Sequence, residues 1–463
     1  MPIPPVRLVS GDMDPAMDPA LAWNGSGWGV AWSDGTRIWF ARLDAAGRSV
    51  GESIPVGTPA RRARHARLVW TSDGYGVAWD DVRGRPDRQD VRFARLDAEG
   101  LPLGPDLTVS SSSCGALFPT LVWTGSDFGL AWEDCRDNDW EIYFASVDRG
   151  GDWASAPRRI TASPENSMMP AMVWDGVGYG VTWSDLRPLP DNGDNYEILF
   201  TRLDAAGVAL GPDIRMTTAP GSGLWPSLAW TGSDYVLAWH DRRDDPDLLL
   251  GRIFTVRLDA AGQPYEPPNP ISDPGRAADT PALLWTGDEL ALTWAEAGLV
   301  SGSGSVVRMA RLTSAMVPMG RPLTVSRAAR AARKPSLSWS GTAFGVTWDD
   351  TREGDHDNFF AAVRCDCVDE DDDGYLSCFD CDDTSARIHP GAIDLPGDRL
   401  DQDCDGTPQC DSEAEGQSRG ERISCVERVC AALIQGGRVK PWECGRPFSR
   451  GRGERPGRLL PGD

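Results

Sequence analysis

The chain has 463 residues and a formal net charge of −23, with 40% hydrophobic and 25% charged residues. This composition suits a folded protein with a large core, and no apolar run approaches the length of a transmembrane helix. An acidic chain without a basic patch also argues against nucleic acid as a partner. The charge is uneven, because residues 365–411 hold 15 acidic side chains against two arginines.

A pair of tryptophans nine positions apart occurs seven times in the chain. The first tryptophans of successive pairs are separated by 47, 53, 51, 56, 55 and 54 residues. An internal period near fifty residues is typical of a β-propeller or a repeat array. The pairs are Trp23/Trp32, Trp70/Trp79, Trp123/Trp132, Trp174/Trp183, Trp230/Trp239, Trp285/Trp294 and Trp339/Trp348.

Each repeat predicts four short antiparallel strands, as the third copy illustrates. Phe128, Leu130 and Trp132 alternate with small residues, so one face of this strand carries large side chains and the other small ones. Such a strand suits sheets that stack closely. Further strands are expected at 141–148 and 158–162, which completes one propeller blade.

The ends of the array predict that the ring closes. The seventh copy stops after a third strand at 358–363, and the chain then runs into Cys365. The segment 5–10 precedes the first repeat and could supply the missing fourth strand. We therefore predict an all-β fold, a seven-bladed β-propeller over residues 1–364 whose N-terminal strand closes the last blade. An open solenoid of the same repeats is the alternative.

An aspartate follows the second tryptophan by two residues in most copies, and an arginine often follows two residues later. We interpret these repeated pairs as salt bridges within the fold, because catalytic groups in a ring normally break the repeat. The polar insertions at 187–195 and 243–247 do break it and could line one mouth of the ring. The pairs are Asp81/Arg83, Asp134/Arg136, Asp185/Arg187, Asp241/Arg243 and Asp350/Arg352.

Nine of the eleven cysteines lie after residue 364, and the other two, Cys114 and Cys135, flank the third tryptophan unit. A disulfide between these two would join parts of one blade. The pattern favours an oxidising compartment, so we expect an extracellular or cell-surface protein. The first five residues lack the features of a signal peptide, which we interpret as a truncated or misassigned start.

Residues 369–380 match the spacing of a calcium loop. Carboxylates fall at positions 1, 3 and 5, a glycine at 6, a residue offering its backbone carbonyl at 7 and an aspartate at 12. A second Asp-x-Asp-x-Asp-Gly core follows at 401–406. We predict a small, loop-rich module over 365–411, held by disulfides and ordered by metal. The predicted ligands are Asp369, Asp371, Asp373, Tyr375, Asp380, Asp382, Asp383, Asp401, Asp403 and Asp405.

The segments 369–375, 380–383, 388–392, 395–398 and 400–406 together resemble a metal-binding repeat family. This family is named for the copper-binding surface protein of methanotrophs and recurs in secreted bacterial proteins. The resemblance implies extracellular placement and metal binding by the aspartates given above. The propeller repeats also resemble tryptophan-rich repeats of secreted bacterial proteins, a resemblance that carries no activity.

The ligand types favour calcium over copper as the bound metal. Carboxylates are the ligands of hard cations, whereas copper prefers imidazole or sulfur, and His389 is the only imidazole of the segment. At Arg399 the sequence departs from the glycine usual in the family, which alters the turn before the second core. Copper stays the alternative.

These features predict a secreted or cell-surface binding or display protein with a propeller as its recognition scaffold. Its partner would be an extracellular protein or polysaccharide that the sequence does not identify. The alternatives are an extracellular carbohydrate-active enzyme with carboxylates such as Asp185 or Asp241 at the propeller mouth, and a copper-binding surface protein. The Gly-, Arg- and Pro-rich tail at 412–463 is predicted to be disordered.

Overall fold

The computed structural model divides the chain into two compact units, Met1–Cys365 and Asp366–Asp463. Residues 6–7, 15–83, 88–110, 112–187, 195–218, 221–243, 251–297, 304–326, 331–351 and 356–364 are described in the first unit. In the second unit the described residues are 382, 384–388 and 402. Within all of these ranges, no helix is long and apolar enough to cross a membrane.

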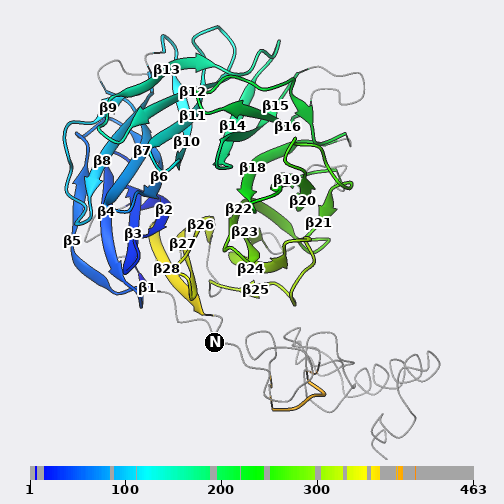
Figure 1. Ribbon diagram of the computed structural model, residues 1–463. Helices are drawn as coiled ribbons and strands as arrows, with labels where there is room; N and C mark the ends of the chain where they lie inside the picture. Colours follow the sequence, from blue (N-terminus) through cyan, green and yellow to red (C-terminus); the bar gives the residue numbers. More distant parts are fainter. Residues whose placement is uncertain are drawn as a thin grey trace, which may run out of the picture. The chain divides into compact units, whose positions relative to one another are not determined.

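Seven four-stranded antiparallel sheets stand around a central axis, as Figure 1 shows, which confirms the predicted seven-bladed propeller. The first strand of each blade is innermost, and the fourth is outermost and often only two residues long.

Blade 1 holds β2 (Met17–Trp23), β3 (Gly27–Ser33), β4 (Ile38–Asp44) and β5 (Ser49–Val56). Blade 2 holds β6 (Ala63–Trp70), β7 (Gly74–Asp81), β8 (Asp90–Asp97) and β9 (Leu107–Thr108). Blade 3 holds β10 (Ala116–Trp123), β11 (Asp127–Asp134), β12 (Glu141–Asp148) and β13 (Trp153–Arg159). Blade 4 holds β14 (Ser167–Trp174), β15 (Gly178–Asp185), β16 (Glu197–Asp204) and β17 (Ile214–Arg215). Blade 5 holds β18 (Gly223–Trp230), β19 (Tyr235–Asp241), β20 (Arg252–Leu258) and β21 (Asn269–Pro270). Blade 6 holds β22 (Ala277–Trp285), β23 (Glu289–Ala297), β24 (Ser305–Thr313) and β25 (Leu323–Thr324). Blade 7 holds β26 (Arg333–Trp339), β27 (Ala343–Asp350), β28 (Asp357–Arg364) and, from the N-terminus, β1 (Val6–Arg7).

The ring is closed by a strand from the opposite end of the propeller sequence. β1 pairs antiparallel with β28, with Val6 opposite Phe360 and Arg7 opposite Phe359. The expectation that the N-terminal segment completes the last blade is therefore confirmed. In a closed ring both faces of every blade are covered, because each blade has a neighbour on both sides.

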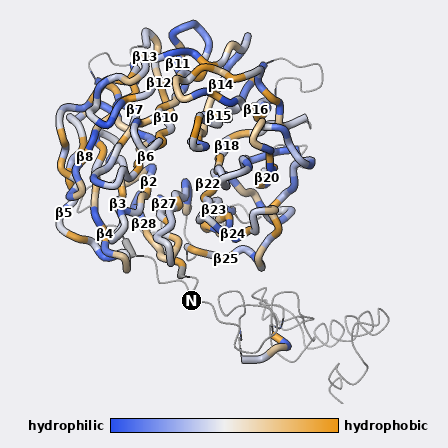
Figure 2. Tube along the Cα trace, viewed as in Figure 1, coloured by the Kyte–Doolittle hydropathy of each residue, from blue (hydrophilic) through white to orange (hydrophobic). Residues whose placement is uncertain are grey.

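Large side chains of one blade pack against small residues of the preceding blade. A Cβ added to Gly129 of β11 would lie 2.5 Å from Cε1 of Tyr179 in β15. The same relation joins the last blade to the first, since a Cβ on Gly345 would lie 2.6 Å from Cζ3 of Trp28. Glycine is needed where an aromatic ring approaches the strand this closely. Figure 2 shows that hydrophobic and hydrophilic segments both occur in every blade.

The second tryptophan of every pair is buried in the core of its blade. In blade 4, Trp183 is fully buried, and its Nε1 donates a hydrogen bond to Asp185 Oδ2 at 2.8 Å. Arg187 Nε lies 2.7 Å from Asp185 Oδ1. These tryptophan, aspartate and arginine residues form the repeat frame, which is complete in four blades: Trp79/Asp81/Arg83, Trp132/Asp134/Arg136, Trp183/Asp185/Arg187 and Trp239/Asp241/Arg243.

Four of the five predicted aspartate and arginine pairs are thus salt bridges within blades, and Arg352 of the fifth pair, Asp350/Arg352, lies outside the described residues. Asp185 is fully buried and Asp241 nearly so. Both accept hydrogen bonds from the tryptophan and the arginine of their own frame. These two carboxylates, suggested for the enzyme alternative, serve the fold.

A disulfide joins Cys114 and Cys135, whose Cα atoms are 5.7 Å apart. It connects the segment that leads into β10 to the residue that follows β11, within blade 3. The sequence identified this pair as the candidate, and the structure confirms it.

Candidate ligand-binding site

The innermost strand of every blade contains a β-bulge opposite the buried second tryptophan. In blade 4, Met168 pairs with Ser184 and Ala171 with Thr182, so Met169 and Pro170 together oppose the single residue Trp183. The same register shift occurs in β2, β6, β10, β18, β22 and β26. Bulges re-aim side chains and are frequent near functional sites.

The first residue of each bulge has a left-handed backbone, with φ between 48° and 56°. None of the seven is a glycine, although a left-handed conformation costs other residues about 1–2 kcal/mol. Strain of this kind is concentrated at ligand-binding sites. These residues form the bulge ring: Asp18, His65, Phe118, Met169, Trp225, Thr280 and Lys334.

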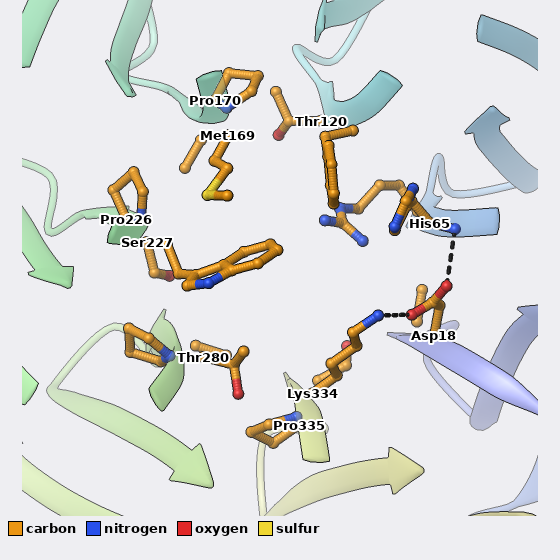
Figure 3. A pocket seen from close by; sticks show the side chains of 18 of the residues that line it. Asp18, His65, Thr120, Met169, Pro170, Pro226, Ser227, Thr280, Lys334 and Pro335 are labelled. Carbon is orange, nitrogen blue, oxygen red and sulfur yellow. Dashed lines mark hydrogen bonds and ion pairs between the residues drawn. The ribbon is translucent and has the colours of Figure 1, made fainter. Parts of the chain in front are cut away.

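All seven residues of the bulge ring line one cavity at the centre of the propeller, with a volume of about 300 Å³. Figure 3 shows the labelled members converging on it from different blades. The volume lies at the lower end of the range for small-molecule pockets, so the cavity suits a small ligand.

One arc of the ring is charged and comes from blades 7, 1 and 2. Lys334 Nζ forms an ion pair with Asp18 Oδ1, and the backbone N–H of His65 donates to Asp18 Oδ2 at 3.2 Å (Figure 3). Burial alone would raise the pKa of Asp18, but the charges of His65 and Lys334 outweigh it and lower this pKa to about 2. Asp18 is therefore a carboxylate at neutral pH.

His65 is held in place from behind the cavity wall. Its Nδ1 lies 2.6 Å from Oδ2 of the buried Asp80, and Gln89 Nε2 donates to Asp80 Oδ1 at 2.8 Å. The imidazole also packs on Phe118, with ring centroids 3.9 Å apart. These contacts fix the orientation of His65 at the cavity.

The opposite arc is apolar and comes from blades 3, 4 and 5. Phe118 and Trp225 meet edge to face, with centroids 5.5 Å apart and an angle of 74° between the rings. Met169 lies between them in the ring sequence and lines the same cavity. The cavity is thus amphipathic, with charged groups facing an aromatic and aliphatic wall.

Two further carboxyl groups are buried near the ring but do not line the cavity. Glu133 accepts a hydrogen bond from the backbone N–H of Met169 at 2.9 Å, and burial raises its pKa to about 8. Burial likewise raises the pKa of Asp349 to about 7. Asp18 is the one carboxylate among the residues that line the cavity. A pair of cavity carboxylates, which glycoside hydrolysis normally uses, is therefore not found in the described lining.

Most site residues expected from the sequence belong to the repeat frame or lie outside the described residues. Of the insertions at 187–195 and 243–247, Arg187 and Arg243 belong to the repeat frame, and residues 188–194 and 244–247 lie outside the described residues. Of the predicted metal ligands, only Asp382 is described. The others lie outside the described residues: Asp369, Asp371, Asp373, Tyr375, Asp380, Asp383, Asp401, Asp403 and Asp405.

Asp382 is exposed and takes part in a local turn. Thr384 Oγ1 donates to its Oδ1 at 2.6 Å, and the backbone N–H of Ser385 donates to its carbonyl at 3.0 Å. The described parts of the chain contain no group of three or more histidine, cysteine, aspartate or glutamate side chains that could hold a metal. The predicted ligand set remains a prediction.

The bulge ring was not predicted above, although the sequence carries a signal for it. Each ring residue stands five positions before the first tryptophan of its pair, and six of the seven precede a proline. The residue type at this position changes in every blade, while the proline that follows it recurs in six of the seven. This position breaks the repeat in every blade, which is where the sequence argument placed functional groups.

Residues 380–408 match the family named Cu-binding MopE, described as "Putative metal-binding motif". The resemblance drawn from the sequence is therefore confirmed for this range, and the chain carries a metal-binding motif after its propeller. Of the first predicted loop, residues 369–380, only Asp380 falls within the matched range. No curated protein sequence matches the chain.

Solved structures similar to the propeller include enzymes that act on polysaccharides. The polysaccharide lyase Uly1 matches with a TM-score of 0.50 and 11% identity, over 77% of this chain and 91% of its own. The α-L-arabinanase of Penicillium chrysogenum, complexed with arabinobiose, has a TM-score of 0.47 and 13% identity, over 68% and 99%. The α-L-arabinofuranosidase Arb93A of Fusarium graminearum has a TM-score of 0.46 and 12% identity, over 68% and 99%. At such low identity these matches show the propeller fold alone.

Proposed function

We propose that the protein is an extracellular binding protein whose bulge-ring cavity holds a carbohydrate. The observation that carries this proposal is the bulge ring itself. Seven strained, non-glycine residues occupy equivalent positions, line one cavity and differ in every blade, while the repeat frame around them recurs. A purely structural position would be expected to repeat as the frame does.

The chemistry of the cavity favours a sugar over a fully apolar ligand. Trp225 and Phe118 offer aromatic faces and edges for the C–H surface of a sugar ring. Asp18, His65 and Lys334 on the opposite arc supply donors and acceptors for hydroxyl groups. Uly1, whose structure is similar, is a polysaccharide lyase, which agrees with this ligand class. We propose binding rather than hydrolysis because only one carboxylate lines the described cavity.

A glycan array probed with the full chain tests this proposal. We expect the wild type to retain a subset of oligosaccharides and Trp225→Ala to bind them at least about tenfold more weakly, since an aromatic anchor is worth 2 kcal/mol or more. Trp153→Ala is the matched control, because Trp153 is exposed on the outermost strand β13 of blade 3. No retained glycan, or equal binding by Trp225→Ala, would contradict the proposal.

We propose further that the acidic module at 365–411 is ordered by calcium, with copper as the alternative ion. The proposed ligands are oxygen donors, which suits a hard cation. Calcium should protect this module in the full chain from proteolysis, and Asp371→Asn combined with Asp373→Asn should remove the protection. Unchanged protection in the double variant, or protection by copper alone, would overturn the calcium assignment.

A further inference from the structure

A second ring of residues lines the cavity beside the bulge ring. These residues stand two positions after each bulge-ring residue, where the regular strand pairing resumes. Six of the seven are small. Ser227 Oγ accepts a hydrogen bond from Leu283 N at 2.9 Å and Ser336 Oγ from Leu21 N at 3.2 Å, so these two tie neighbouring blades together. The second ring is Ala20, Arg67, Thr120, Ala171, Ser227, Ala282 and Ser336.

Arg67 is the exception in this ring, and blade 2 breaks the pattern at the preceding position as well. Ala66 stands where the other six blades have a proline. Arg67 is a long cationic side chain where every other blade has alanine, serine or threonine. Because its neighbours in the second ring are small, space for a guanidinium remains in the cavity.

The guanidinium of Arg67 lacks a direct carboxylate partner within the described part of the chain. Its Nη1 donates to the backbone carbonyl of Ala66 at 3.0 Å, and no described carboxylate oxygen lies within 4.0 Å of it. Burial lowers the pKa of Arg67, while the more distant charges of Asp18 and Asp80 act in the opposite direction. An arginine keeps its charge at neutral pH in any case, and the half-buried guanidinium of Arg67 lines the cavity without a close counter-ion.

We infer that Arg67 is an anion-binding residue of the cavity and that the bound saccharide carries a carboxylate, as a uronic acid residue does. This inference rests on the proposed function. The planar guanidinium matches a carboxylate with two parallel hydrogen bonds. Asp18 does not oppose the ligand strongly, because Lys334 is paired with it. The sugar ring would then lie toward Trp225 and Phe118, on the apolar arc.

Calorimetry with the full chain and matched pairs of oligosaccharides tests this inference. The probes are uronate oligosaccharides, the same compounds with their carboxylates reduced to alcohols, and sulfated neutral galactans. We expect at least one uronate to bind, and its carboxyl-reduced counterpart to bind at least about tenfold more weakly, the loss of a charge-assisted hydrogen bond. Arg67→Gln should show the same loss for the uronate and no change for the reduced compound.

Two further variants test whether binding needs the guanidinium geometry of Arg67 as well as its charge, and whether loss of any arginine lowers binding. Arg67→Lys keeps the charge without the bidentate fork and should bind with intermediate affinity. Arg149→Gln changes an exposed arginine, paired with Asp73 on the surface, and should bind as the wild type does. Thermal unfolding of each variant shows whether the fold is intact.

The possible outcomes have distinct meanings. Equal binding of uronate and reduced sugar, or normal uronate binding by Arg67→Gln, overturns the inference while the proposed function stands. Binding of sulfated galactan alone, if it depends on Arg67, supports the anion site and overturns the carboxylate assignment. Absence of binding to any carbohydrate overturns the proposed function and this inference with it.

Discussion

The repeat frame and the bulge ring lie on adjacent strands but follow different rules. Met169 of the ring stands opposite Trp183 of the frame, and the two belong to neighbouring strands of one sheet. The frame carries the same residue types in blade after blade, whereas the ring carries a different residue in each. Selection for packing and selection for ligand contacts would produce this contrast on a single scaffold.

The physical demands on the two sets explain the difference. A frame tryptophan must fill a fixed volume and find an acceptor for its indole N–H, which in blade 4 is Asp185. The bulge fixes the backbone conformation of a ring residue. Its side chain faces the central cavity and is therefore free to vary. The residue type therefore varies at positions where the fold tolerates a change and where the side chain can contact a ligand.

The same substitution in the two sets should have very different effects on stability. Trp183→Ala removes a fully buried side chain and should lower the free energy of unfolding by about 3–5 kcal/mol, because the surrounding core fills the space left by the indole only partly. Trp225→Ala in the ring should cost much less, since this side chain is only half-buried. Urea unfolding followed by tryptophan fluorescence measures both. Similar losses for the two variants would contradict the division into frame and ring.

The disulfide of blade 3 stabilises the fold and lies outside the cavity lining, as the repeat frame does. Replacing Cys114 and Cys135 together by alanine should lower the free energy of unfolding by about 3 kcal/mol, the loop-closure value for a separation of 21 residues. Glycan binding should persist under native conditions, because neither cysteine lines the cavity. Loss of binding in a variant that is still folded would show that the frame and the ring are not independent.

Glu133 connects the repeat frame to the bulge ring, because it directly follows a frame tryptophan and accepts a hydrogen bond from the backbone N–H of Met169. Its folded-state pKa of about 8 lies above its ordinary value of 4.5. Folding therefore takes up a proton between these two pH values, and this contribution to stability is full below pH 4.5 and is lost as the pH rises to 8. Asp349, with a folded-state pKa of about 7, acts in the same direction.

The melting temperature of the wild type should accordingly fall between pH 5 and pH 8. Glu133→Gln removes the titrating group and keeps an oxygen that can accept the Met169 N–H. We expect its melting temperature to depend less steeply on pH, with Asp349 among the groups that account for the remaining slope. An unchanged slope in Glu133→Gln would show that Glu133 is not the group responsible.

The smallest effect concerns the strained backbone of the ring. Met169→Gly relieves a left-handed conformation, with φ of 56°, whereas Met168→Gly changes a neighbouring residue outside the left-handed region. Because the strain is worth about 1–2 kcal/mol, Met169→Gly should be the less destabilising of the two by about 1 kcal/mol. Equal losses in denaturant unfolding would mean that the bulge carries no strain.

The fold was readable from the sequence because its signals are periodic and redundant. The seven tryptophan pairs indicated a propeller or a repeat array, and the alternation around Trp132 indicated closely stacked sheets. The partial seventh repeat indicated that the ring closes. The repeated Asp185/Arg187 type of pair was likewise recognisable as structural, since a residue pair present in most blades is unlike a unique site.

The bulge ring could not be derived in the same way. A residue that precedes proline is normally extended, so Met169 or Trp225 reads as part of a regular strand. The left-handed conformation arises from the bulge, which depends on the pairing of two strands rather than on local sequence. Arg67 stands out only when the seven inner strands are superposed, because its significance lies in the small residues at the equivalent positions.

The central claim is that the bulge ring is the ligand-binding surface of the propeller. A structure of the full chain bound to the oligosaccharide with the highest affinity on the array tests it most directly. The account predicts that the sugar lies in the central cavity, in contact with Trp225 and with its carboxylate on Arg67. A sugar bound on the outer strands such as β5 or β13, with the cavity free of it, would contradict the account.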